Sequence, residues 1–126
     1  MPRFVILHHE FPAGHPRASH WDLMFEDGES LRTWALSREP FTAEELEAEQ
    51  LSDHRLAYLE YEGPVLGDRG SVTRWDQGKY RLKKETPDVW QAEMHGARIL
   101  GSLTLVRKTK GNHFWRVSFG ALPRAD

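Results

Sequence analysis

The chain has 126 residues, of which 39% are hydrophobic and 11% aromatic, enough for one domain with its own core. It contains no cysteine, which excludes thiolate metal sites, thiol nucleophiles and disulfides, so any metal must bind nitrogen and oxygen ligands. The net charge of −2 excludes a strongly basic molecule, so nucleic acid would have to bind a local patch. No apolar run approaches the roughly 20 residues that span a bilayer, and we expect a single cytoplasmic domain over residues 1–126.

Short apolar segments, several of them with alternating polarity, dominate the chain. They are rich in Val, Trp, Phe, Tyr and Thr, and turn dipeptides such as Asp27-Gly28 and Gly111-Asn112 separate them. This pattern is typical of successive antiparallel strands. In chain order, the expected strands are residues 3–7, 20–26, 31–36, 71–75, 79–82, 89–94, 98–107 and 113–119.

One helix is expected after the third of these strands. Pro40 precedes it, and Thr42 as N-cap with Glu45 at position N3 forms a capping box ahead of Leu46 and Leu51. About eight short strands and one helix suit a small closed antiparallel β-barrel better than an open sheet with exposed edges. The expected fold class is therefore mostly β.

The segment 20–26 places an imidazole and a carboxylate together. His20 and Asp22 are two positions apart, so in a strand their side chains point to the same side, roughly 7 Å apart. Apolar side chains of the same segment point the opposite way: Trp21, Leu23 and Phe25. An imidazole and a carboxylate opposite an apolar face suggest a metal site on a sheet.

Further histidines precede this segment. Four fall within thirteen positions that also contain Glu10, with Asp22 two positions beyond, namely His8, His9, His15 and His20. This set of nitrogen and oxygen ligands suits manganese or zinc. Histidines that merely lie exposed on loops and strands are the alternative interpretation. The five tryptophans, spread over the expected strands, fit a core better than a base-stacking surface.

Five segments, in order, resemble the 3′-phosphoesterase domain attached to bacterial end-joining DNA ligase D. They are residues 3–10 (RFVILHHE), 20–28 (HWDLMFEDG), 31–36 (LRTWAL), 53–63 (DHRLAYLEYEG) and 70–78 (GSVTRWDQG). The combination of a His-x-Asp element with an Asp-His-x-x-x-Tyr element is specific. The resemblance covers nearly the whole chain.

This resemblance implies an activity and a set of site residues. The family removes a terminal ribonucleoside and then a 3′-phosphate from DNA 3′ ends, leaving a 3′-hydroxyl, with manganese as the usual metal; zinc or cobalt are alternatives. By resemblance, the metal ligands would be His9, His20 and Asp22. His54 and Tyr58 would contact the scissile phosphate. The imidazole of His54 would donate a hydrogen bond or a proton there.

The chain departs from the family pattern at three places. Met24 stands where the family has an arginine, and a thioether cannot hold a phosphate. An arginine from elsewhere could replace it: Arg17, Arg38 or Arg55. The interval between His9 and His20 is longer than in the family and contains His15, which is a rival ligand to His9. The glycine-rich loop is shortened to residues 64–70.

The primary functional hypothesis is a metal-dependent phosphoesterase that processes DNA 3′ ends in DNA repair. One alternative is a catalytically impaired module of the same fold that binds DNA ends or a repair partner, and another is a small-molecule phosphohydrolase. The expected partners are primer-template or nicked DNA 3′ ends, together with end-joining ligase or polymerase proteins. We expect a monomer that does not bind membranes.

Overall fold

Strands form nearly all of the regular structure in the computed structural model, which describes residues 1–40 and 45–121. The strands are β1 (Arg3–Glu10), β2 (His20–Asp27), β3 (Ser30–Leu36), β4 (Glu45–Arg55), β5 (Gly63–Pro64), β6 (Ser71–Thr86), β7 (Val89–Gly96), β8 (Leu100–Arg107) and β9 (Phe114–Ala121). A single-turn 3₁₀ helix, η1 (Leu56–Leu59), follows β4. Among the described residues, no helix is long and apolar enough to cross a membrane.

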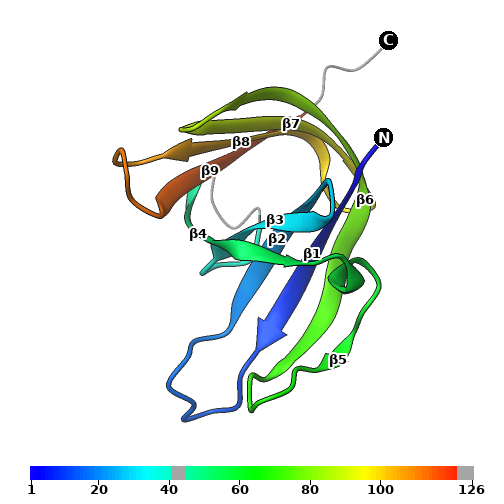
Figure 1. Cartoon of the computed structure of the whole chain (residues 1–126), viewed down its shortest axis with the longest axis vertical. Coiled ribbons are helices and arrows are strands. Elements are labelled where there is room, and N and C mark those ends of the chain that lie inside the picture. The colour runs from blue at the N-terminus through cyan, green and yellow to red at the C-terminus, as the bar shows by residue number, and fades with distance from the viewer. Residues whose placement is uncertain (41–44, 122–126) are drawn as a thin grey trace.

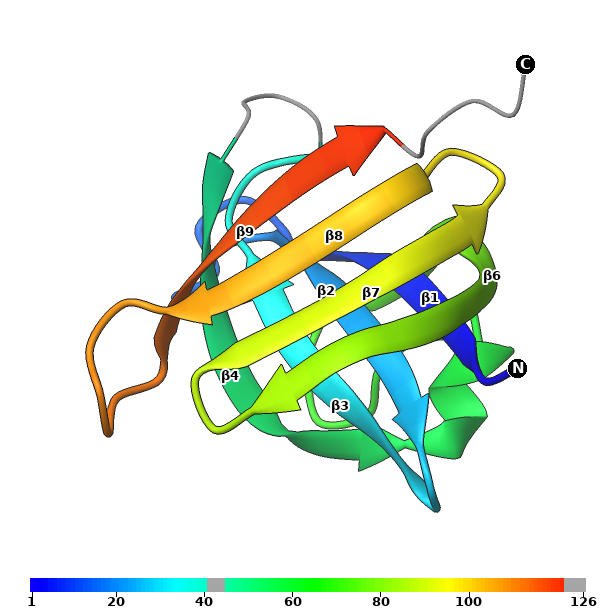
Figure 2. The same cartoon turned by 90° about the horizontal axis from the view of Figure 1, so that it is seen from above.

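Eight of the strands form a closed antiparallel ring in the order β1-β2-β3-β4-β9-β8-β7-β6, and β6 pairs back with β1 (Figures 1 and 2). The long strand β6 closes this ring, since residues 71–79 pair with β1 whereas residues 78–86 pair with β7. The short β5 lies beside β6. A ring leaves no long strand edge unpaired, and the expected barrel-like, mostly β fold is confirmed.

Apolar side chains fill the ring and also cover part of its outside. On β1, Phe4 and Ile6 belong to the large core cluster that contains residues of seven other strands. The alternating residues Val5 and Leu7 pack in a second cluster with Leu59 of η1. The outer face of β1 and β2 is therefore covered by the segment that follows β4, and this covering forms the base of the site described below.

The prediction of a helix is wrong for the part that the structure describes, because Glu45–Arg55 is strand β4. Thr42 lies outside the described residues. From Glu45 to Glu49 exposed and buried positions alternate, with Leu46 and Ala48 buried. This period of two lets β4 pair with β3 and β9, which closes the ring, and these pairings outweigh the local helix signal.

The other expected strands are present, except that residues 71–75 and 79–82 belong to the single strand β6. The short elements η1 and β5 were not expected. The largest buried side chains in the core include Trp34, Trp90 and Trp115, each at most 1% exposed. Trp21 and Trp75 pack against the same cluster but are only partly buried. The expectation that tryptophans form core rather than a stacking surface is thus confirmed for the three buried ones.

Candidate functional site

Strands β1 and β2 bring two histidines and one aspartate together at one end of the ring. In the antiparallel register His9 lies opposite His20, and Leu7 lies opposite Asp22. His9 and Asp22 are therefore diagonal neighbours on the same face. On β2, Met24 packs in the outer cluster and Leu23 in the inner one, so the predicted alternation of the two faces is confirmed.

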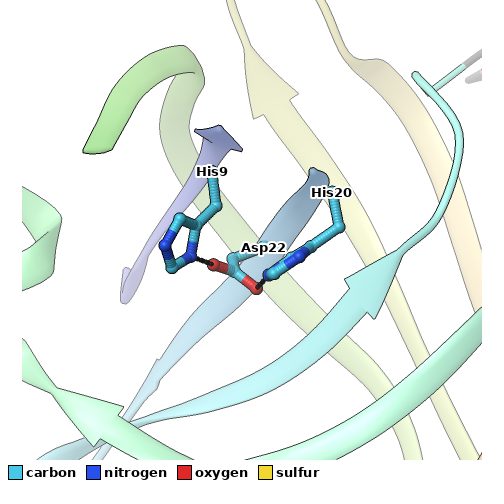
Figure 3. A group of neighbouring side chains, drawn as sticks. All are labelled: His9, His20 and Asp22. Carbon is cyan, nitrogen blue, oxygen red and sulfur yellow. Dashed lines mark hydrogen bonds and ion pairs between the residues drawn. The ribbon is translucent and has the colours of Figure 1, made fainter. Parts of the chain in front are cut away.

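The carboxylate of Asp22 lies between the two imidazoles (Figure 3). His9 Nδ1 is 3.2 Å from Asp22 Oδ2, and His20 Nε2 is 3.0 Å from Asp22 Oδ1. The three ligand atoms lie within 4.8 Å of one another. The Asp22 side chain is 3% exposed and each histidine side chain 12%, so the group is largely removed from water.

Backbone carbonyls determine which nitrogen of each imidazole faces the carboxylate. His9 Nε2 is 2.5 Å from the carbonyl oxygen of Arg69, and His20 Nδ1 is 3.1 Å from that of Ala18. A carbonyl only accepts, so these outer nitrogens must carry the protons. In their neutral forms both imidazoles then direct a lone pair at one carboxylate, which is unfavourable unless a proton or a metal ion lies between them.

This arrangement fits a divalent metal ion. Asp22 Oδ1 is buried and, despite the nearby His20 nitrogen, accepts no well-directed hydrogen bond from the described residues. The inner nitrogen of His20 faces this oxygen and that of His9 faces the other carboxylate oxygen, Oδ2. The outer N–H groups are held by carbonyls, as is usual around bound metals. His9, His20 and Asp22 thus form the candidate metal centre.

The same contacts alter the acid–base properties of the group. Burial raises the pKa of Asp22, but polar contacts with His20 and His9 and their charges outweigh burial and lower that pKa to about 2. Burial lowers the pKa of His20, whereas the contacts with Asp22 and Ala18 raise it, and the net pKa lies above its ordinary value. Asp22 is therefore a carboxylate at neutral pH, as a metal ligand must be.

The candidate metal centre lies in a cleft of about 820 Å³ between the outer face of β1 and β2 and the segment from β4 to β6. Its lining from β1, β2 and β6 is Leu7, His9, His20, Asp22, Met24 and Val72. Residues 51–55, 57, 58, 61, 64–66 and 69 line the other side, and Arg17 also contributes. A smaller hollow of about 340 Å³, lined by residues 98–102, 119 and 120, has no imidazole or carboxylate.

His54 and Tyr58 both line this cleft, from the end of β4 and from η1. Their rings meet edge to face with centroids 6.0 Å apart. His54 Nδ1 is 2.9 Å from the carbonyl oxygen of Ser52, so Nδ1 carries a proton and Nε2 remains for a ligand. The two residues are four positions apart, and the chain passes from β4 into η1 between them.

His15 does not join the metal-ligand group. Its Nε2 donates to the carbonyl oxygen of Asp68 at 3.1 Å, and its Nδ1 accepts from the backbone N–H of Arg17. The ring of Phe11 lies between His15 and the centre: it stacks on His9 and contacts His15 at a tilt. The long β1–β2 loop and the loop before β6 thus lie side by side at one end of the molecule (Figure 1).

Two of the three predicted phosphate-binding arginines line the cleft: Arg17 and Arg55. Arg38 is exposed and does not line it. The structure adds Arg69, which sequence reasoning missed. The signal for Arg69 was weak, since it is one charged residue between the glycines of a shortened loop, and its proximity to His9 depends on the pairing of β1 with β6.

The comparisons with known proteins identify a family. The sequence model of one family, the DNA ligase D 3′-phosphoesterase domain, matches residues 9–107. This span contains every residue of the candidate metal centre as well as His54 and Tyr58. No curated protein matches the chain. The family indicates phosphoesterase chemistry in DNA repair and interaction with DNA ends. The chain belongs to the DNA ligase D 3′-phosphoesterase domain family.

Proposed function

We propose that the chain is a metal-dependent phosphoesterase that removes a 3′-phosphate or a 3′-terminal ribonucleoside from DNA and leaves a 3′-hydroxyl. The observation that carries this proposal is the pair of imidazoles whose inner nitrogens face one buried carboxylate inside a large cleft. Family membership supports the reaction class. We further propose that residues 1–126 act as one cytoplasmic, monomeric domain, recruited to repair by ligase or polymerase proteins.

In this proposal, His9, His20 and Asp22 would hold a divalent ion. Manganese is the metal that the family resemblance implies, and two imidazoles and a carboxylate without a thiolate also suit zinc and cobalt. When bound, such an ion polarises a phosphoryl oxygen and stabilises charge on the leaving oxygen. The carbonyls of Arg69 and Ala18 would keep the two imidazoles oriented before the ion arrives.

His54 and Tyr58 would act on the phosphate itself. With Nδ1 bound to the Ser52 carbonyl, a protonated His54 would present Nε2–H to an oxygen of the scissile phosphate and donate a hydrogen bond or proton as charge develops. The hydroxyl of Tyr58 would donate to a second oxygen. Arg17 and Arg55 would add positive charge along the cleft and hold the neighbouring backbone.

The test is a manganese titration on a labelled primer-template that ends in a 3′-phosphate or a single 3′-ribonucleotide. We expect metal-dependent conversion to a 3′-hydroxyl, lost in Asp22→Asn. Asp88→Asn is the matched control, because it removes the same charge from the turn between β6 and β7, outside the cleft. Failure of the wild-type protein to convert either end with manganese, zinc or cobalt would refute the proposal.

A DNA-end binding module is the second candidate, favoured by one observation. Met24, where the family has an arginine, is fully buried and brings no charge to the cleft. A pure binder would retain 3′-phosphate ends in the same assay and release no product. A small-molecule phosphohydrolase would instead cleave mononucleotides as fast as oligonucleotides and show little dependence on salt.

A further inference from the structure

The loop before β6 places one arginine, Arg69, beside the candidate metal centre. The carbonyl oxygen of Arg69 lies 2.5 Å from His9 Nε2, so the backbone of this residue is anchored to a candidate ligand. The same residue lines the cleft. A residue that contacts the candidate centre through its backbone can place its charge on a phosphate held there.

The side chain of Arg69 is prepared for an anion. Its Nε donates to the carbonyl oxygen of Leu66 at 2.6 Å, which fixes the plane of the guanidinium. Within residues 1–40 and 45–121, its two terminal amino groups form no hydrogen bond or ion pair. Two parallel N–H groups of this kind match two oxygens of a phosphate.

The backbone around Arg69 packs against the end of β1. The residues Gly67, Asp68 and Gly70 all have positive φ, and Val65 N–H donates to the carbonyl oxygen of Gly70 at 2.8 Å. A Cβ on Gly70 would lie 2.1 Å from the carbonyl oxygen of Glu10, so the loop packs directly on the end of β1. Arg69 thus lies on a loop that is packed against β1, and such packing lowers the entropy lost on binding.

The other two arginines of the cleft are held differently. The guanidinium carbon of Arg17 lies 5.2 Å from the centre of the Phe11 ring, so its charge is directed to an aromatic face. Arg55 ends β4 and has no backbone contact with a residue of the candidate metal centre. Arg69 has both a backbone contact with His9 and terminal amino groups that form no hydrogen bond or ion pair with the described residues.

We propose that Arg69 determines specificity for a terminal 3′-phosphate. This inference rests on the proposed function and names its preferred substrate as a phosphomonoester end. A phosphomonoester carries up to two negative charges and three non-bridging oxygens, whereas an internal diester has one charge and two such oxygens. Two oxygens can bind the terminal amino groups of Arg69 while the third remains for the candidate metal centre and His54.

The experiment measures binding rather than turnover. Fluorescence anisotropy would compare a recessed DNA end bearing a 3′-phosphate with the same end bearing a 3′-hydroxyl, in EDTA, for the wild-type protein and for Arg69→Gln. A lost bidentate, charge-assisted contact corresponds to about tenfold or more in affinity. We expect the wild-type protein to prefer the phosphate end by that factor and Arg69→Gln to lose the preference while binding the hydroxyl end unchanged.

Two further variants separate a role of Arg69 in phosphate recognition from a purely structural role. Arg69→Lys keeps a charge but loses the planar fork, so it should retain part of the preference. Arg81→Gln removes an exposed arginine of β6 outside the cleft and should retain all of it. A merely structural Arg69 would weaken binding of both ends equally, and that result would overturn the inference, as would a wild-type protein without preference.

The outcome is distinguishable from that of the proposed function. Manganese-dependent turnover together with an unchanged preference in Arg69→Gln refutes only the role of Arg69. A preference that disappears in Arg69→Gln, in a protein without turnover, supports Arg69 as the phosphate contact and refutes the enzyme. Circular dichroism and a urea titration of each variant verify that the fold is kept, which we expect because the His9 contact uses only the backbone of Arg69.

Discussion

The loop before β6 should control metal affinity, and Gly70→Ala tests this directly. Gly70 has φ +72°, and an added Cβ would meet the carbonyl oxygen of Glu10 at 2.1 Å. The left-handed conformation costs an alanine about 1 to 2 kcal/mol. The contact must lengthen by roughly 1 Å to reach 3.0 Å, the lower limit of real Cβ contacts, and such backbone shifts typically cost a further 1–3 kcal/mol.

The shift should also disturb the candidate metal centre. Arg69 precedes Gly70, and its carbonyl accepts the hydrogen bond from His9 Nε2. Loss of an outer partner of a metal-binding histidine typically lowers metal affinity about 10- to 100-fold. We therefore expect Gly70→Ala to bind manganese at least about tenfold more weakly, as measured by isothermal titration calorimetry, and to unfold at lower urea concentration in EDTA.

Gly28→Ala is the matched control. Gly28 has φ +65° in the turn between β2 and β3, and its added Cβ would meet nothing within 4 Å. This variant shares the conformational strain without the clash and lies outside the cleft. Equal metal affinity in Gly70→Ala and Gly28→Ala would refute the reasoning that the loop orients His9.

Three further predictions concern other groups. His54→Gln should lower the turnover rate on a 3′-phosphate end by about 10²-fold or more if His54 is the proton donor, and single-turnover kinetics with the full rate retained would exclude that role. Asp76 is buried and accepts hydrogen bonds from four backbone N–H groups, so Asp76→Ala should lower the free energy of unfolding by at least about 3 kcal/mol, and a loss below about 1 kcal/mol in urea titrations would contradict this. Burial, followed by the charges of nearby carboxylates, raises the pKa of Tyr80 from 10 to about 12. Because the folded state holds the proton more tightly, this contribution to stability is complete below pH 10 and is lost between pH 10 and 12; it amounts to at most about 2 to 3 kcal/mol. Tyr80→Phe should lack this loss when urea midpoints are compared across that range.

Local pattern accounts for much of the fold. The alternation in residues 20–26 was enough to predict that His20 and Asp22 share a face, because side chains on a strand have a period of two regardless of its neighbours. The same rule was available at β4, where Leu46 and Ala48 alternate with glutamates, but the capping-box pattern suggested a helix. Propensity is a weak signal where strand pairing closes a ring.

The candidate site depends both on local sequence pattern and on tertiary structure. The sequence by itself determined the strand character of most segments, the absence of thiolate chemistry, and the adjacency of an imidazole and a carboxylate on one strand. Only the tertiary structure decided that His9 faces His20, that His15 is held by Asp68, and that Arg69 reaches His9 across 60 residues of chain. The physical reason is that periodicity is a property of a few consecutive residues, whereas these contacts arise from strand register and from the closure of β6 onto β1.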